Sequence, residues 1–284
     1  MRPILNLIKK ITIPKDLCYN IFFLENEELS YIGYRQKLSD ESRYSILQEG
    51  MLLGKFLKMD VEADSYVIYF IKGDVPYWGK KLSLSCENWD IRFPFAPRDA
   101  TGAEALCDAQ FWQEKAKNAE DLDKEEAHFR GYSIKMLSEL LEKPSCIYDP
   151  ACSTGKFLST MQEYYPENKY WASDASEEMV KCARSRGLNS FVLDIIKDQP
   201  PRSFDIIFCR FVNQEIVQAA KAETVIKKLY SFLEKDGYLI IFGHTPVACN
   251  IVDFCKKEKL VLRHRIGWSE AFEGIFQYYI LQKN

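Results

Sequence analysis

SCIYDPACSTGKFLSTMQEYY, residues 145–165, is the stretch that decides the fold of this chain. Its apolar start predicts a short strand that ends at Asp149, followed by a turn of small residues and then by a helix. Small side chains at Ala151, Ser153 and Gly155 let a ligand approach the backbone, and the exposed N–H groups of a helix start attract a polar or anionic group. A strand, turn and helix of this kind is only a weak indication of a nucleotide site.

Two further strands strengthen that indication because each ends in an acid. KYWASD (169–174) ends at Asp174, and NSFVLD (189–194) ends at Asp194. In an open α/β sheet the ligand binds at the carboxyl edge, and an acid after the second strand can accept both ribose hydroxyls. We therefore expect the three strand-terminal acids to form one crevice.

The rest of this region alternates β-branched runs with amphipathic helices, which is typical of a parallel sheet covered on both faces. The last two apolar runs are too close in sequence for a parallel crossover and predict an antiparallel hairpin. The fold class is thus α/β, a Rossmann-like doubly wound sheet that is mostly parallel with an antiparallel C-terminal hairpin. The later strands are expected at 204–210, 237–244, 260–266 and 275–282.

The chain divides into two predicted domains. Residues 1–100 form a smaller mixed α/β lobe, with strands at 18–25 and 65–72 and helical spacing over 41–58. Residues 101–284 form the Rossmann-like domain, whose first helices form a lid that covers a cofactor.

DPACSTGKFL (149–158), the two later strand-end acids, FDIIFCRFV (204–212) and EKDGYLIIF (234–242) resemble the class I S-adenosylmethionine-dependent methyltransferases. The resemblance spans roughly residues 125–284 and implies S-adenosylmethionine as the cofactor. The DPAC form also resembles adenine-N6 DNA methyltransferases, but these carry an Asn/Asp-Pro-Pro-aromatic motif after strand four. This chain has Cys-Arg-Phe-Val-Asn there (209–213), which argues against base methylation.

The resemblance also implies roles for individual residues. The small-residue loop would wrap the methionine part, Asp174 would bind the ribose and Asp194 would contact the adenine amine. Asp174 is alternatively a helix N-cap, Asp194 a solvated acid, and Arg210 either a clamp for a carboxylate or a surface salt bridge. The expected cofactor residues are Asp149, Ala151, Cys152, Ser153, Gly155, Asp174, Ala175, Met179, Asp194, Ile195 and Arg210.

Catalytic groups are expected where the reacting end of the cofactor should lie. Asn213 follows strand four, and His244 ends strand five as a candidate general base. Tyr132 and the Phe111–Trp112 pair offer aromatic faces to a sulfonium, although ordinary interhelical packing explains them equally well.

Composition excludes several other classes. The net charge is -3 and charges of both signs are interspersed, so nothing indicates a nucleic-acid or membrane partner. No signal peptide, zinc ligand set or run of roughly 18 apolar residues occurs, and the nine cysteines form no CxxC pair. We expect a cytoplasmic protein with reduced thiols and no metal, whose oligomeric state is open, a homodimer being one option.

Three functions remain. The first is methyl transfer to a small molecule in small-molecule biosynthesis, because the sulfonium is already an activated electrophile. The second is intramolecular cyclisation of S-adenosylmethionine to azetidine-2-carboxylate and methylthioadenosine in a closed site. The third is a non-catalytic S-adenosylmethionine-binding protein.

Overall fold

The structure is a computed structural model, and it describes residues 7–35, 46–73, 88–99, 102–104, 106–107, 109–243 and 246–284. The chain forms two compact units. The first consists of Met1–Ala105 and Arg265–Gln277, and the second of Leu106–His264 and Tyr278–Asn284. The first unit therefore includes the tip of the C-terminal hairpin as well as the N-terminal lobe.

The described part of the N-terminal lobe is built from strands and short 3-10 helices. Six strands form an antiparallel sheet in the order β1-β6-β5-β3-β2-β7. Apolar side chains such as Ile21, Phe23, Ile32 and Ile68 pack together on this sheet. The elements are β1 (Ile8–Pro14), η2 (Lys15–Asn20), β2 (Ile21–Glu25), β3 (Ser30–Tyr34), β4 (Leu47–Gln48), η3 (Glu49–Met51), β5 (Leu52–Val61), β6 (Ser65–Ile71) and β7 (Asp90–Arg92).

The helix expected over 41–58 is wrong for the described part of that segment, where β5 begins at Leu52. This strand pairs with β3 and β6 on its two sides. Gly54 lies so close to its neighbour that an added Cβ would stand 2.1 Å from the carbonyl oxygen of Ile71. Pairing on both edges satisfies the backbone and overrides the local helical spacing.

The second unit holds the larger sheet, in the order β10-β9-β8-β11-β12-β14-β13. Strands β10 to β12 pair in parallel, whereas β14 is antiparallel to β12. The doubly wound, mostly parallel fold with an antiparallel end is confirmed. Its strands are β8 (Cys146–Asp149), β9 (Lys169–Asp174), β10 (Asn189–Val192), β11 (Phe204–Arg210), β12 (Leu233–Phe242), β13 (Val261–Ser269) and β14 (Gly274–Gln282).

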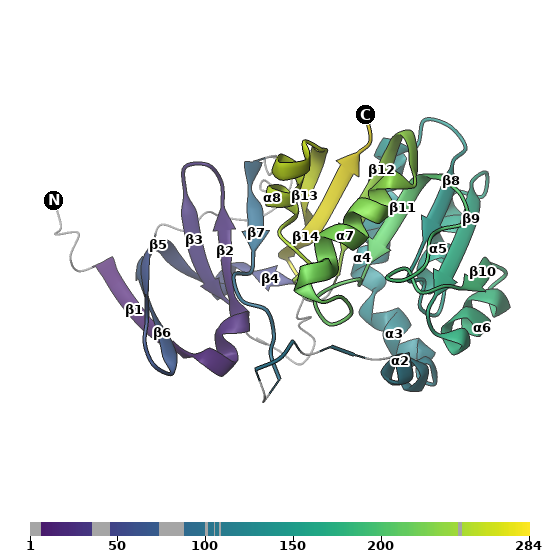
Figure 1. Cartoon of the computed structure of the whole chain (residues 1–284). Coiled ribbons are helices and arrows are strands. Elements are labelled where there is room, and N and C mark those ends of the chain that lie inside the picture. Colours follow the sequence, from purple (N-terminus) through teal and green to yellow (C-terminus); the bar gives the residue numbers. More distant parts are fainter. Residues whose placement is uncertain are drawn as a thin grey trace. The chain divides into compact units, whose positions relative to one another are not determined.

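Helices cover both faces of this sheet, as Figure 1 shows with α7 and α8 in front and α4 and α5 behind. Alternate residues of a strand therefore pack on opposite layers. Ile207 of β11 belongs to the core under α7 and α8, whereas Phe208 stacks edge-on against Phe157 of α5 at 4.9 Å. The helices are α2 (Ala109–Ala116), α3 (Ala119–Glu125), α4 (Ala127–Leu140), α5 (Lys156–Tyr164), α6 (Glu177–Ser185), α7 (Ala219–Ser231) and α8 (Ile251–Glu258).

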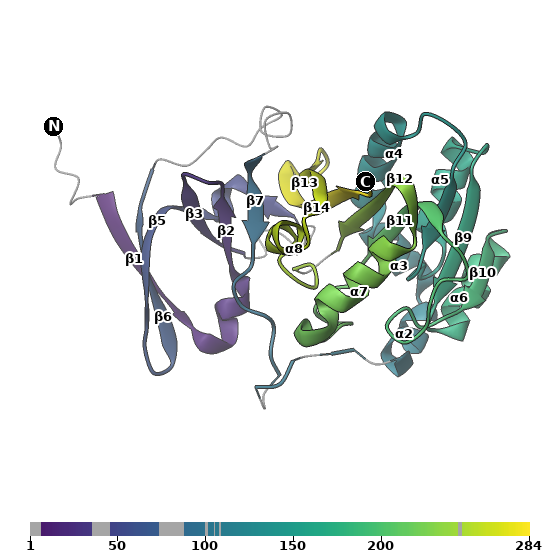
Figure 2. The ribbon, with the colours of Figure 1, turned by 45° about the horizontal axis from the view of Figure 1, so that its top comes forward.

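The expected helices before β8 are present as α2, α3 and α4. Helix α2 packs against α6, and the two lie side by side in both ribbon views (Figures 1 and 2). Within the ranges that the structure describes, no helix is both long and apolar enough to cross a membrane.

Candidate active site

A cavity of about 400 Å³ lies at the carboxyl edge of the parallel strands. This is the edge where ligands bind in open α/β sheets, and the strand order reverses here between β8 and β11. The described lining residues come from α2 and the residues before it, from α3 and its junction with α4, from the last residues of β9 and β11, and from the segments after β8, β9, β10 and β11. They are Cys107, Phe111, Trp112, Lys115, Leu122, Glu126, Pro150, Ala151, Ser153, Asp174, Ala175, Met179, Leu193, Asp194, Ile195, Ile196, Lys197, Arg210, Phe211, Val212, Asn213, Glu215 and Ile216.

The loop after β8 is held by backbone hydrogen bonds to the end of β9. Cys152 N donates to Ser173 O at 2.8 Å, and Ser153 N donates to Asp174 Oδ2 at 2.9 Å. The loop ends at Gly155, whose φ of 79° is left-handed, and an added Cβ there would lie 2.8 Å from Ala183 of α6. The small residues thus allow the loop to pack closely on α6, while Ala151 and Ser153 face the cavity.

Asp174 is at the centre of this arrangement. Its two carboxylate oxygens accept hydrogen bonds from Ser153 N and Ser176 N, both at 2.9 Å. Burial raises the pKa of Asp174, and these two N–H groups act against that rise. Since the helix N-cap is Ser176, which accepts from Met179 N, the N-cap alternative for Asp174 is not what the structure shows.

Asp194 has a more solvated environment. Its carboxylate pairs with Lys197 Nζ at 2.7 Å and accepts from Ile196 N at 3.0 Å. Partial burial acts to raise the pKa of Asp194, but the hydrogen bond from Lys197 and the backbone N–H groups outweigh it and lower the pKa. Asp194 therefore lines the cavity as a paired carboxylate.

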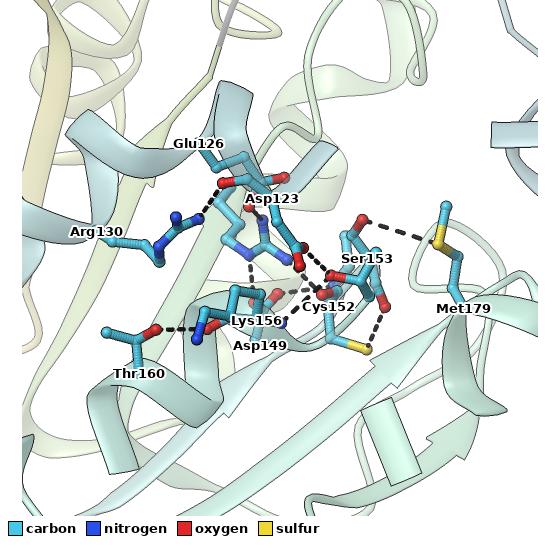
Figure 3. A network of polar contacts seen from close by, with 12 residues as sticks. Asp123, Glu126, Arg130, Asp149, Cys152, Ser153, Lys156, Thr160 and Met179 are labelled. Carbon is cyan, nitrogen blue, oxygen red and sulfur yellow. Dashed lines mark hydrogen bonds and ion pairs between the residues drawn. The ribbon is translucent and has the colours of Figure 1, made fainter. Parts of the chain in front are cut away.

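Arg210 is fully buried at the end of β11 and is not a surface salt bridge. Its guanidinium binds the carboxylate of Asp149, the carbonyl of Cys152 and, at 2.8 Å, Glu126 Oε2. Figure 3 shows how Glu126, Asp149 and Cys152 converge in this network. Burial alone would lower the pKa of Arg210, but the carboxylates of Asp149 and Glu126 raise it. Arg210 thus joins the sheet, the loop after β8 and the covering helices.

The covering helices are fastened at a second acid, Asp123 of α3. Its carboxylate accepts from the Thr154 hydroxyl and pairs with Arg186 Nη2 at 2.6 Å. The neighbouring Leu122 and Glu126 line the cavity. The covering helices are therefore held at two acids: Asp123 contacts the loop at Thr154 and the end of α6 at Arg186, and Glu126 pairs with Arg210.

The segment after β11 begins with an unusual backbone. Phe211 has a φ of 54°, and its N–H donates to Phe242 O at 2.8 Å. Asn213 is buried, and its Oδ1 accepts from Glu215 N at 3.1 Å. The carbonyl of Glu215 in turn accepts from Cys107 N at 2.7 Å, which joins this segment to the residues before α2.

Residues 147–237 match the family model of a methyltransferase domain. This matched stretch is a methyltransferase domain of the class I S-adenosylmethionine-dependent kind. Along most of its length it is similar to isonocardicin synthase of Nocardia uniformis subsp. tsuyamanensis, with 25% identity over 280 residues, 93% of this chain and 92% of the relative. A carboxy-S-adenosyl-L-methionine synthase of Campylobacter fetus subsp. fetus is 31% identical over 118 residues, 39% of this chain and 49% of that one.

Solved structures are also similar to part of this chain. Plantazolicin methyltransferase, in complex with S-adenosylhomocysteine, has a TM-score of 0.47 at 14% identity. The alignment covers 62% of this chain and 95% of the plantazolicin methyltransferase chain. An S-adenosylmethionine-dependent methyltransferase from Clostridium acetobutylicum has a TM-score of 0.45 at 17% identity, over 55% of this chain and 90% of its own.

S-adenosylmethionine is the cofactor of such domains, and the cavity suits it. S-adenosylmethionine carries a sulfonium, an ammonium and one carboxylate. Among the described lining residues, the four acids outnumber the three bases. The indole Nε1 of Trp112 is buried without a hydrogen-bond partner among the described residues, and Trp112 lines the cavity. A net acidic wall and an unpaired donor are what a cationic ligand with polar edges requires.

The structure brings most of the expected cofactor residues together at the cavity. Ala151, Ser153, Asp174, Ala175, Met179, Asp194, Ile195 and Arg210 line it. Asp149, Cys152 and Gly155 lie behind that lining: the first two are fully buried, and Gly155 packs on α6. These three support the loop rather than face the cavity.

The expected catalytic residues are divided. Asn213 lines the cavity. The structure does not bring Tyr132 to it, because α4 turns the Tyr132 hydroxyl toward His264 Nε2, 2.9 Å away on β13. His244 lies outside the described residues. Of the aromatic residues expected near a sulfonium, Phe111 and Trp112 line the cavity.

Sequence reasoning missed Glu126, Asp123 and Phe211. The two acids lie in a polar acidic stretch, AEDLDKEEA (119–127), in which no spacing marks which carboxylate turns inward. Phe211 was only part of the motif comparison after strand four. A positive φ at a phenylalanine leaves no sequence signal.

Proposed function

We propose that the cavity binds S-adenosylmethionine with its ribose at Asp174, its adenine beside Asp194 and Ile195, and its methionine part along Ala151 and Ser153. The support is the position of each side chain along the carboxyl edge of the sheet. Asp174 keeps acceptor capacity after its two backbone hydrogen bonds, because a carboxylate offers about four lone-pair sites. Ribose hydroxyls supply the matching donors.

The proposed reaction is methyl transfer to a small molecule. The observation that carries it is the match of residues 147–237 to a methyltransferase domain whose acid-lined cavity lies at the expected sheet edge. The sulfonium supplies the activated carbon, so the protein has mainly to orient an acceptor in line with the carbon–sulfur bond and to exclude water.

Asn213 is proposed to orient the acceptor. It follows β11 and lines the cavity, and its own Oδ1 is held by Glu215 N at 3.1 Å. An amide fixed in this way presents its remaining groups in one orientation, which favours alignment of a nucleophile.

A second candidate, intramolecular cyclisation, is favoured by one observation. The cavity volume of about 400 Å³ is near the lower end of the roughly 300–1,000 Å³ typical of ligand sites and leaves little space beside a ligand as large as S-adenosylmethionine. In this reaction the α-amino nitrogen forms a bond to the γ-carbon, the carbon–sulfur bond breaks, and its electron pair stays on sulfur. Methylthioadenosine leaves, and the nitrogen loses one proton to solvent.

Product analysis separates the two reactions. Purified protein is incubated with S-adenosylmethionine alone and then with a panel of small amines, phenols and carboxylic acids, followed by mass spectrometry. S-adenosylhomocysteine formed only with an acceptor supports methyl transfer, and methylthioadenosine with azetidine-2-carboxylate in its absence supports cyclisation. Asp174→Asn is the matched control, in which either product should fall strongly. Absence of S-adenosylmethionine binding by calorimetry would reject both reactions.

A further inference from the structure

Phe211 stands out among the residues with unusual backbone angles. Five described non-glycine residues have positive φ, namely Ser153, Phe211, Asp236, Lys259 and Glu273. Only Phe211 carries a ring, and the left-handed region is unfavourable for a bulky side chain. Such a conformation persists where the surroundings impose it, and it is concentrated at functional sites. Phe211 also lines the cavity.

Packing holds the Phe211 ring in place. The ring meets Phe129 edge-to-face at 5.3 Å and Phe242 at 6.0 Å. Its N–H is fixed by Phe242 O at 2.8 Å. Two other rings and one strand end therefore keep this ring at the cavity wall, next to the point where the strand order reverses.

The positive charge of Arg210 beside the ring is compensated by acids. Arg210 Cζ lies 5.7 Å from the centroid of the Phe211 ring. Its charge is offset by Asp149 and Glu126, and Arg130 also acts on Glu126, so the four groups together carry no net charge when all are ionised. Glu126 itself lines the cavity. A positive charge that approaches the ring from the cavity therefore meets this carboxylate and no uncompensated cation among these four groups.

We propose that Phe211 faces the sulfonium and selects the cationic cofactor over its uncharged thioether products. This inference rests on the proposed binding of S-adenosylmethionine in this cavity. Aromatic faces attract cations. The sulfur becomes a neutral thioether when one of its carbon substituents is transferred, because the electron pair of the broken bond stays on sulfur. Phe211 thus favours binding before the reaction and product release after it, a role for which the sequence suggested Tyr132, Phe111 and Trp112.

Calorimetric titration with S-adenosylmethionine and S-adenosylhomocysteine tests the proposal. In Phe211→Leu the affinity for S-adenosylmethionine should fall roughly threefold to tenfold, and that for S-adenosylhomocysteine less than about twofold. Phe111→Leu is the matched control, the same change at another ring on the cavity, and it should keep the wild-type ratio of affinities. An equal loss for both ligands in Phe211→Leu, or an unchanged ratio, would overturn the proposal.

A second measurement covers the case in which Phe211→Leu does not fold. Site-specific replacement of Phe211 by phenylalanines with increasing numbers of ring fluorines keeps the shape and weakens the negative face. The affinity for S-adenosylmethionine should fall stepwise while that for S-adenosylhomocysteine stays level, and a flat series contradicts the assignment. Wild-type protein that binds neither ligand would instead reject the proposed function.

Discussion

The loop after β8 and the segment after β11 leave neighbouring parallel strands and line the same cavity, but different forces hold them. The loop is fixed through its backbone, by Cys152 N on Ser173 O and Ser153 N on Asp174. The segment starts from a buried guanidinium, Arg210, that reaches back to Asp149 and across to the covering helices at Glu126. The loop is thus a backbone surface for a ligand, and the segment is a charged junction between sheet and lid.

This difference separates two kinds of damage. Changes of the polar groups in the loop should act on cofactor affinity, because these groups serve short-range backbone contacts. Stability should respond to a change at the junction, which leaves buried charges without partners, and to a change at Gly155, where the loop packs closely on α6. The predictions below test this division, beginning with the largest expected effect.

Replacing Arg210 by methionine should cost about 3–5 kcal/mol of unfolding free energy, because Asp149 and Glu126 would remain buried and unpaired. Urea denaturation measures this free energy.

The unpaired acids of the variant would bind protons more readily in the native state than in the unfolded chain. The stability of the variant should therefore rise as the pH is lowered, and its loss relative to the wild type should shrink. Arg186→Met is the control, since Arg186 is 28% exposed in its pair with Asp123 and should cost less than about 1 kcal/mol. Equal losses of unfolding free energy in the two variants would contradict the idea that the buried Arg210 junction stabilises the fold more than the partly exposed Arg186–Asp123 pair.

Replacing Gly155 by alanine tests the close packing of the loop. We expect a loss of about 2–4 kcal/mol, because the change combines a left-handed φ of 79° with a Cβ only 2.8 Å from Ala183 Cα. Gly187→Ala provides the matched control, since Gly187 has a φ of 81° and nothing within 4 Å of its added Cβ. It should cost about 1–2 kcal/mol, the backbone contribution alone. Thermal unfolding of both variants gives the difference, and its absence would show that α6 moves aside.

Particular residues show how far the sequence could predict this molecule. Strand-end acids and small loop residues have local signals, so the sheet, the cofactor class and positions such as Asp174 were predictable. The helix expected over 41–58 failed in the described part of that segment because pairing of β5 with β3 and β6 overrides the local helical spacing. Arg210 was placed correctly after strand four, but its partner Glu126 lies 84 residues away on another element. No local pattern contains that pairing.

Replacing Asp174 by asparagine should weaken S-adenosylmethionine binding roughly tenfold to thirtyfold, because a charged acceptor for two hydroxyls is lost. Asp194→Asn is the comparison variant, expected to cost less than about threefold because Lys197 already pairs with that carboxylate. Calorimetry gives both values. Burial raises the pKa of Asp174 above its ordinary value of 3.8. As the solution is acidified, Asp174 is therefore protonated at a higher pH than an ordinary aspartate, and the wild-type affinity should begin to fall at that higher pH. A flat acid profile, or equal losses in the two variants, would move the ribose site elsewhere.

The smallest expected effect is at Trp112 of α2, which lines the cavity. Just before α2, Cys107 N donates a hydrogen bond to Glu215 O. Trp112→Phe removes an indole N–H that has no partner among the described residues, so the free protein should lose less than about 0.5 kcal/mol of unfolding free energy. Affinity for S-adenosylmethionine should nevertheless fall roughly threefold, the effect of one neutral hydrogen bond. Parallel measurements of unfolding and of binding separate the two quantities. A loss in stability without a loss in affinity would show that the indole packs the lid and does not contact the ligand, leaving recognition to the loop after β8.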